Sequence, residues 1–139
     1  EIGSVDAAPF VAAALRDPVV GVASWACQAL ATIGDPATLP ALHYYHDRLL
    51  SERAAGTLPA SVGHPDFIIS QSAATRLVLG DRSARPELAS FLLSDDLSAR
   101  RTAHSALTSI YQERHGYEPD GPVDLRRAAA RRWQADRTP

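Results

Sequence analysis

Gly34-Asp35-Pro36-Ala37-Thr38-Leu39-Pro40-Ala41-Leu42 is the stretch that decides the fold, because the chain repeats its frame. The frame is a glycine, a residue able to cap a helix, four further positions, a proline, one position and an aliphatic residue. The same order begins again at Gly3, where it ends in Val11, and at Gly80, where it ends in Leu88. A frame that recurs along a chain is typical of repeat proteins, in which each copy builds the same small unit.

Each copy of the frame predicts a corner between two helices. Glycine readily adopts the left-handed conformation that closes a helix. The side-chain oxygen of the next residue, which is Ser4, Asp35 or Asp81, can then cap the following helix. A proline at the first helical position, such as Pro36, costs no hydrogen bond. The second proline of the frame comes about one turn later, where it should bend the helix or restart it.

The composition is that of an ordinary globular domain. The chain has 139 residues, 45% apolar and 22% charged, and this length suits a single domain over residues 1–139. No apolar run approaches the roughly 18 to 20 residues of a membrane span, so we expect none. The net charge of −2 gives no overall attraction to nucleic acid. Because the chain has no methionine, we do not expect Glu1 to be the native start, and the compartment stays open.

The single cysteine is expected to serve packing. Cys27 has no second cysteine to pair with, which excludes a disulfide within the chain and a thiolate metal cluster. Its apolar neighbours Ala26 and Ala29 predict a small buried side chain rather than a reactive thiol.

Hydrophobic periodicity divides the chain into helix pairs. On the helix that ends at Ile33, Val19 and Val22 are expected to share the buried face. This pattern returns in register later in the chain, where Ile110 takes the place of Ile33. The expected divisions are a partial first repeat at 1–16, a helix pair at 17–52, an inserted loop at 53–64, a second pair at 65–94 and a final pair with a C-terminal capping helix at 95–136.

The inserted segment explains an uneven spacing of the frame. Gly3 and Gly34 are closer together along the chain than Gly34 and Gly80 are. The segment 53–64 has no helical period and carries turn-forming residues, so it is expected to be a loop on one surface. Insertions in repeat proteins often contribute to binding. A functionless excursion is the alternative.

The corner and the short helix pairs that it joins resemble the HEAT-like repeats first described in phycobilisome lyases. The ending Gly116-Tyr117-Glu118-Pro119-Asp120, followed by Arg126, Ala129, Ala130 and Trp133, is similar to the closing segment of bacterial HEAT-repeat domains. The resemblance implies an all-α, right-handed α-solenoid of stacked antiparallel helix pairs, with about three and a half repeats. It also implies an armadillo-like scaffold that mainly binds other proteins. Some members of the family are enzymes, but an activity does not transfer with a fold.

Two histidines suggest either a metal site or a pair of rings packed in a helix interface. His43 and His46 are three residues apart on an expected helix, a spacing at which two imidazoles can share a metal. However, both positions fall in the same helical arc as leucines, and no glutamate completes a metal-binding pair. We therefore expect the rings to fill a helix interface, with no metal, no cofactor and no catalytic residue.

A recognition patch is the preferred functional interpretation of the same region. Tyrosine is favoured among the anchors of protein interfaces, and second helices usually line the concave side of such arrays. The patch expected to bind a partner consists of His43, Tyr44, Tyr45, His46 and His64.

Arginines gather at the C-terminal end. All 14 cationic residues of the chain are arginine, and a local basic group comprises Arg126, Arg127, Arg131, Arg132 and Arg137. Binding to a phosphate backbone needs several cations on one surface. These arginines scatter around the expected helix, so a solvated capping face is favoured and nucleic acid is not the expected partner.

The sequence therefore predicts a non-catalytic module that binds or scaffolds another protein through the concave face of a short solenoid. One alternative is an enzyme or accessory protein of the bilin-lyase type, with a site near His43, Tyr45 and His46. A second alternative is nucleic-acid binding through the C-terminal arginines. Asp17, Asp35, Asp81 and Asp96 are interpreted as helix caps rather than catalytic acids. The identity of the partner and the oligomeric state are not encoded in any recognisable motif.

Overall fold

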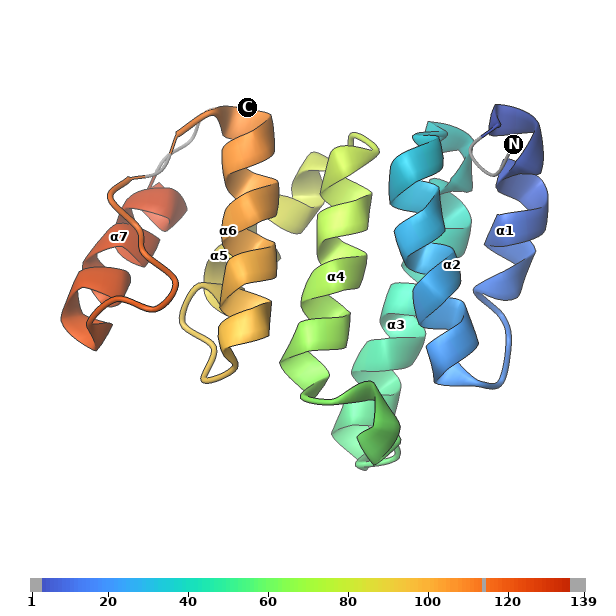
Figure 1. The fold of residues 1–139 in the computed structure, drawn as a ribbon, viewed down its shortest axis with the longest axis horizontal. Coiled ribbons are helices and arrows are strands. Elements are labelled where there is room, and N and C mark those ends of the chain that lie inside the picture. The colour runs from blue at the N-terminus through green and yellow to red at the C-terminus, as the bar shows by residue number, and fades with distance from the viewer. Residues whose placement is uncertain (1–3, 114, 136–139) are drawn as a thin grey trace.

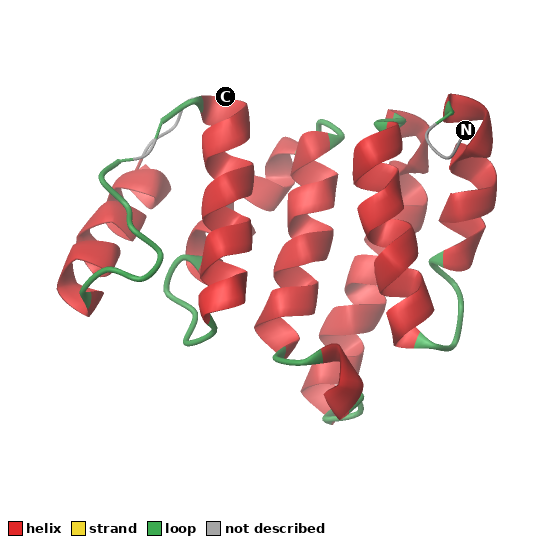
Figure 2. Cartoon of the chain, in the orientation of Figure 1, coloured by secondary structure: helices red, strands yellow, loops and turns green. Residues whose placement is uncertain are grey.

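The computed structural model describes residues 4–113 and 115–135, and within these ranges it is helical and contains no strand. Figure 2 shows this all-helical composition, which confirms the expected class. The α-helices are α1 (Ala8–Ala14), α2 (Val20–Ile33), α3 (Leu39–Ala55), α4 (Pro65–Val78), α5 (Arg85–Phe91), α6 (Leu97–Tyr111) and α7 (Val123–Ala135). Short 3-10 turns are η1 (Val5–Ala7), η2 (Pro36–Thr38), η3 (Ala60–Val62) and η4 (Arg82–Ala84).

The helices stand in two rows. Figure 1 shows α2, α4 and α6 side by side, with α3 and α5 behind them and with α1 and α7 at the two ends. The central helix α4 packs against α2, α3, α5 and α6, whereas α7 packs mainly on α5. The core therefore lies between the rows, where each helix turns its apolar side toward its neighbours.

The repeated corner has the expected backbone. Gly34 and Gly80 adopt φ angles of 76° and 99°, which lie in the left-handed region that glycine tolerates best. Asp35 Oδ1 accepts a hydrogen bond from the Ala37 N–H at 3.0 Å, and Asp81 Oδ1 accepts one from the Ser83 N–H at 3.0 Å. Both aspartates therefore cap the 3-10 turn that follows them. The first glycine of the series, at position 3, lies outside the described residues.

The second proline of each frame restarts the helix, as predicted. Pro9, Pro40 and Pro86 are each the second residue of an α-helix that directly follows a 3-10 turn. Proline lacks the N–H that would continue the turn before it, and its ring fixes φ at a helical value. The chain therefore changes from the tighter 3-10 turn to an α-helix at the same place in all three copies.

The expected buried face of α2 needs one correction. Val19 and Val22 are exposed, whereas Val20 and Ala23 are buried together with Ala26, Cys27 and Leu30. The cap also differs from expectation, because the side chain of Asp17 accepts from the Val19 N–H at 2.8 Å and the helix begins only at Val20. On a helix rich in small residues two apolar arcs compete, and packing selects the one centred nearer Ala23.

The extra length between Gly34 and Gly80 lies mostly in a longer α3, so the link expected at 53–64 begins only after Ala55. α3 has 17 residues, whereas α1 and α5 have 7 each. α3 ends only at Ala55, and Gly56 then closes it with a φ angle of 69°. The remaining link contains η3, and its Leu58 and Val62 side chains pack against the core. The periodicity weakens near residue 53 because the last turns of α3 are largely exposed.

Arg48 and Arg100 each bind the backbone of a link between two helices, and the two links occupy matching positions in the chain. The Arg48 guanidinium donates to the backbone carbonyls of residues 17–18 at 2.5 and 3.0 Å. The buried Arg100 guanidinium donates to the carbonyls of residues 94–95, at 2.7 and 2.9 Å, and to that of Pro119 at 2.6 Å. The two links are related by the same shift along the chain that relates Ile33 to Ile110. A buried carbonyl needs a donor, and the arginine fork supplies several at once.

The buried thiol gives a direct test of the core. Cys27 Sγ donates a hydrogen bond to Thr75 Oγ1 at 3.4 Å, and burial raises the pKa of the Cys27 thiol to about 11, against a smaller lowering by that hydrogen bond. We expect Cys27 to react with Ellman's reagent at pH 8 at least about a thousandfold more slowly in the native protein than in 6 M guanidinium. Rapid native labelling would contradict the packing of α2 on α4.

Candidate partner-binding face

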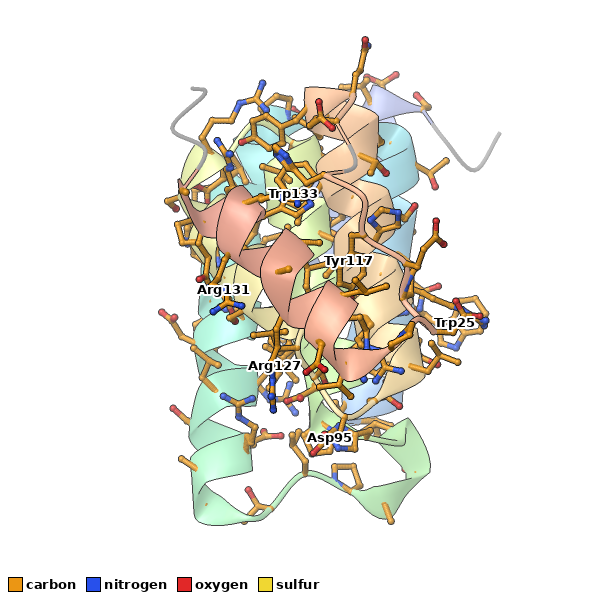
Figure 3. All side chains as sticks on the ribbon, turned by 90° about the vertical axis from the view of Figure 1, so that its left-hand side faces the viewer. Trp25, Asp95, Tyr117, Arg127, Arg131 and Trp133 are labelled. Carbon is orange, nitrogen blue, oxygen red and sulfur yellow. The ribbon has the colours of Figure 1, made fainter. Side chains whose placement is uncertain are left out.

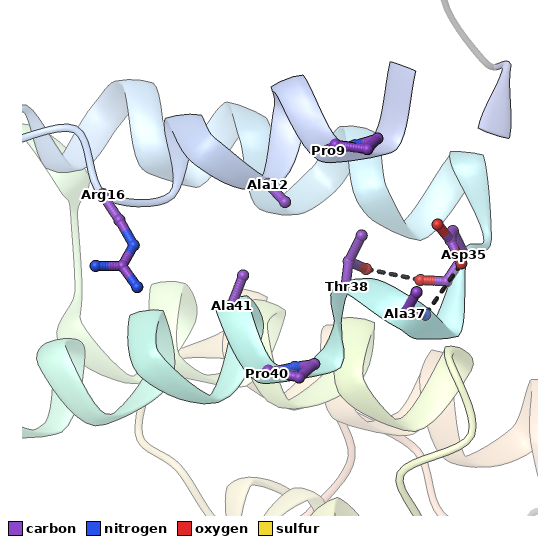
Figure 4. Close-up of a pocket in the computed structure, with 8 residues that line it drawn as sticks. All are labelled: Pro9, Ala12, Arg16, Asp35, Ala37, Thr38, Pro40 and Ala41. Atoms are coloured by element: carbon purple, nitrogen blue, oxygen red, sulfur yellow. Dashed lines mark hydrogen bonds between the residues drawn. The ribbon is translucent and has the colours of Figure 1, made fainter. Parts of the chain in front are cut away.

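A groove runs between α1 and α3. Its volume is about 360 Å³, and the close-up in Figure 4 shows that side chains from both helices line it. The lining residues are Pro9, Ala12, Arg16, Asp35, Ala37, Thr38, Pro40 and Ala41. The groove exists because small alanine side chains face each other across the two helices and fill little of the space between them. We call the surface of α1 and α3 around it the α1–α3 face.

The groove has an opposite charge at each end. Figure 4 shows Arg16 at one end and Asp35 at the other, with the alanines and prolines between them. α1 and α3 run in the same direction along the groove, so Pro9 lies at the Asp35 end. Pro9 and Arg16 are separated by about 10 Å of helix axis at 1.5 Å per residue. Thr38 stabilises the wall by donating to the Asp35 carbonyl at 2.7 Å.

Tyr44 lies on the exposed side of α3, at the Arg16 end. Its side chain is 48% exposed, and the Arg16 guanidinium carbon lies 4.5 Å from the centre of the Tyr44 ring. A cation held over an aromatic face in this way contributes about 0.5–1 kcal/mol at an exposed site. The contact with Tyr44 holds the Arg16 guanidinium in place at this end of the groove.

Tyr45 does not belong to this surface, contrary to the expectation that both tyrosines contribute. It is 1% exposed, because the next position on a helix is turned by about 100° and Tyr45 therefore faces the core. Burial raises the pKa of the Tyr45 phenol above its ordinary value, and the nearby Cys27 adds to this effect.

The two histidines contact two different carboxylates. His43 is exposed, with Nε2 at 3.1 Å from Asp81 Oδ2. His46 is buried, with Nε2 at 2.8 Å from Glu87 Oε1 and Nδ1 in contact with Ser72 Oγ. Only His46 fills a helix interface, where it joins α3 to α4 and α5, whereas the His43 ring lies at the exposed edge. Within residues 4–113 and 115–135, no three His, Cys, Asp or Glu side chains are placed to hold a metal ion together.

Arg76 connects the two carboxylates. It is buried on α4, with Nη2 at 2.8 Å from Asp81 Oδ2 and Nη1 at 3.5 Å from Glu87 Oε2. Burial by itself raises the pKa of Asp81, but hydrogen bonds from Ser83 and Arg76 and the charge of Arg76 together lower it. The polar cluster of His43, His46, Arg76, Asp81 and Glu87 therefore ties α3, α4 and α5 together.

Ser72, His46 and Glu87 contact one another in the same sequence as the serine, histidine and acid of a hydrolase triad. Burial of the serine nevertheless prevents it from acting as a nucleophile. In a catalytic triad the serine hydroxyl must reach a substrate carbonyl. Ser72 is fully buried, and its hydroxyl donates to the Ile69 carbonyl at 3.1 Å. The arrangement therefore joins helices rather than presenting a nucleophile.

His64 lies away from Tyr44. Its Nδ1 accepts a hydrogen bond from the Asp66 N–H at 3.1 Å and so caps α4. The link to His64 leaves the far end of α3, and about 16 Å of helix axis separates Tyr44 from that end. The structure therefore does not bring His64 to the α1–α3 face.

The C-terminal arginines are divided between two roles. Arg126 Nε donates to the Gly121 carbonyl at 3.0 Å, and Arg132 Nη1 donates to the His115 carbonyl at 3.0 Å. Arg127 and Arg131 are exposed on α7, and Figure 3 shows both on one side of that helix. The fifth arginine of this group, at position 137, lies outside the described residues.

Two exposed aromatic residues were missed by the sequence interpretation. Trp25 on α2 is 74% exposed and borders a second groove, which is also lined by Val62, Phe67 and Gln71. Phe10 on α1 is 81% exposed. The signal for Trp25 was available, because it lies about 100° from Ala26 on the helix and points away from the buried arc.

No protein-family model, curated protein or solved structure matches the chain. The likeness to HEAT-like repeats therefore depends on the repeated corner and the closing segment. Among the described helices, none combines the length and the apolar character needed to cross a membrane.

Proposed function

We propose that the protein is a non-catalytic module that binds another protein, built as a short right-handed α-solenoid of HEAT-like helix pairs. Three corners with the same 3-10 turn and the same helix restart support the solenoid interpretation. The equivalent links held by Arg48 and Arg100 support it as well. In such an array the second helices, α1, α3, α5 and α7, form one face of the molecule and the first helices the other.

One observation carries the binding function: the α1–α3 face combines a groove with an exposed aromatic anchor and two charges. Interface energy is concentrated in a few residues, among which tyrosine and arginine are enriched. Tyr44 and Arg16 stack on each other at the rim of the groove, where a partner can contact both.

The alternative functions have less support. The histidines named for a lyase-type site are engaged with Asp81 and Glu87 in the polar cluster. Nucleic-acid binding needs several cations on one surface, whereas Arg126 and Arg132 hold backbone carbonyls of the link before α7.

The proposal is tested with a matched pair of surface variants. A partner is first isolated by affinity purification from the native host, purified, and titrated calorimetrically against wild type, Tyr44→Ala and Trp25→Ala. We expect Tyr44→Ala to weaken binding at least about tenfold and Trp25→Ala to leave it within about twofold, since a central anchor contributes about 1–2 kcal/mol or more. The reverse pattern would place the partner on the α2 side and overturn the proposal.

A further inference from the structure

We propose that the groove between α1 and α3 binds an extended peptide segment of about three residues that carries an acidic side chain at one end and a basic side chain at the other. This inference depends on the proposed function, because it specifies the segment of the partner that the α1–α3 face recognises. Four features of the groove support it: its length, its walls, the charge at each end and the way Arg16 is held.

The length of the groove sets the length of the segment. From the Pro9 end to Arg16 the helix axis covers about 10 Å. An extended chain advances about 3.3 Å per residue, so this length accommodates about three residues. A helix would not fit in the same way, because its diameter of about 10 Å exceeds the space that alanine side chains leave between two packed helices.

The walls select the middle residue. Ala12, Ala37 and Ala41 present methyl groups, and Pro9 and Pro40 present rings without a backbone N–H. The middle residue turns an apolar side chain of modest size to these walls, while the flanking side chains leave the extended chain on its other face and must be long enough to reach the two ends. A charged residue at the middle of the segment would lose its hydration without gaining a partner.

The ends select the flanking residues. The Arg16 guanidinium lies over the Tyr44 ring and carries five N–H donors in a planar fork. A carboxylate can pair with these donors without disturbing the stack. At the other end the Asp35 carboxylate accepts the Ala37 N–H through Oδ1, and it attracts a lysine or arginine of the segment.

The opposite charges also make the groove selective. A segment with acids at both ends, or with bases at both ends, places like charges together at one end, and such contacts disfavour the wrong partner. A substitution of Arg16 alone should therefore change which order of charged residues the groove accepts in a peptide.

The test is a selection from a displayed library of random heptapeptides on the immobilised protein. We expect wild type to enrich peptides with an acidic residue, an apolar residue and a basic residue in neighbouring positions. Arg16→Glu should instead enrich peptides with basic residues on both sides of the apolar one, and should bind the wild-type peptides more than about tenfold more weakly. Asp35→Asn should weaken the wild-type peptides several-fold, because asparagine keeps the helix cap and removes only the charge.

Arg101→Glu is the matched control, since Arg101 is an exposed arginine on α6, away from the groove. It should select the same peptides as wild type, and far-UV circular dichroism should show that all variants fold. Enrichment of the same peptides on wild type and Arg16→Glu, or of no peptide at all, would overturn the inference. If an isolated partner still depends on Tyr44 but not on the charges of Arg16 and Asp35, the proposed function stands and the peptide inference fails.

Discussion

Replacement of Trp133 by alanine is expected to lower the free energy of unfolding by about 3–5 kcal/mol, the usual cost of removing a large buried aromatic side chain. Trp133 is 1% exposed and is among the largest fully buried side chains. Its ring meets Tyr111 edge-on at 6.0 Å and His115 at 4.7 Å. The Arg85 guanidinium lies 5.9 Å from it. Urea denaturation followed by far-UV circular dichroism measures the change.

Trp25→Ala provides the control for this prediction, because the same side chain is removed from an exposed position. We expect it to change stability by no more than about 0.5 kcal/mol. Figure 3 labels Trp133 on α7 and Tyr117 on the link that precedes this helix. Equal losses in the two variants would mean that α7 is not packed through Trp133.

Replacement of Arg76 by alanine is expected to cost about 3 kcal/mol, because removing one partner leaves buried or half-buried charges uncompensated. Arg76 is the group that lies between Asp81 and Glu87, and both carboxylates are largely shielded from water. Thermal and urea unfolding at neutral pH measure the loss.

Arg101→Ala is the matched comparison for Arg76, as it removes an arginine whose Nη2 lies 3.9 Å from Asp120 Oδ2 at an exposed site. Exposed pairs contribute little, so the expected change is within about 0.5 kcal/mol. A loss at Arg76 no larger than that at Arg101 would show that the polar cluster does not stabilise the contact between α3, α4 and α5.

The corners could be predicted from the sequence because they are local. Gly34 and Gly80 need left-handed backbone, and Pro40 and Pro86 restart helices, for reasons that involve only a few neighbouring residues. Hydrophobic periodicity does not identify the buried face of a helix on which two arcs are both apolar. This is why Val22 was expected in the core and is exposed.

The polar cluster could not be predicted, because its partners are far apart in the chain. The spacing of His43 and His46 indicates a shared helix side, but not that Asp81 and Glu87, far along the chain, would meet them. Likewise, nothing near Arg76 in the sequence indicates that it would lie between those two carboxylates.

The groove was missed for a different reason. Ala12 and Ala41 are good helix formers, and in a sequence they suggest close packing. Here they face each other across α1 and α3, and the space between them remains open. Whether small residues close a gap or leave one depends on the distance between helices, which the sequence does not specify.

The uneven packing of the helices implies that the molecule does not resist opening equally along its length. α4 packs against four other helices, whereas α7 packs mainly on α5. Amide protons of α4 would therefore exchange with solvent only through the rarest openings, and those of α7 through openings of lower free energy. A protease acting on the native protein would therefore first encounter the C-terminal helix.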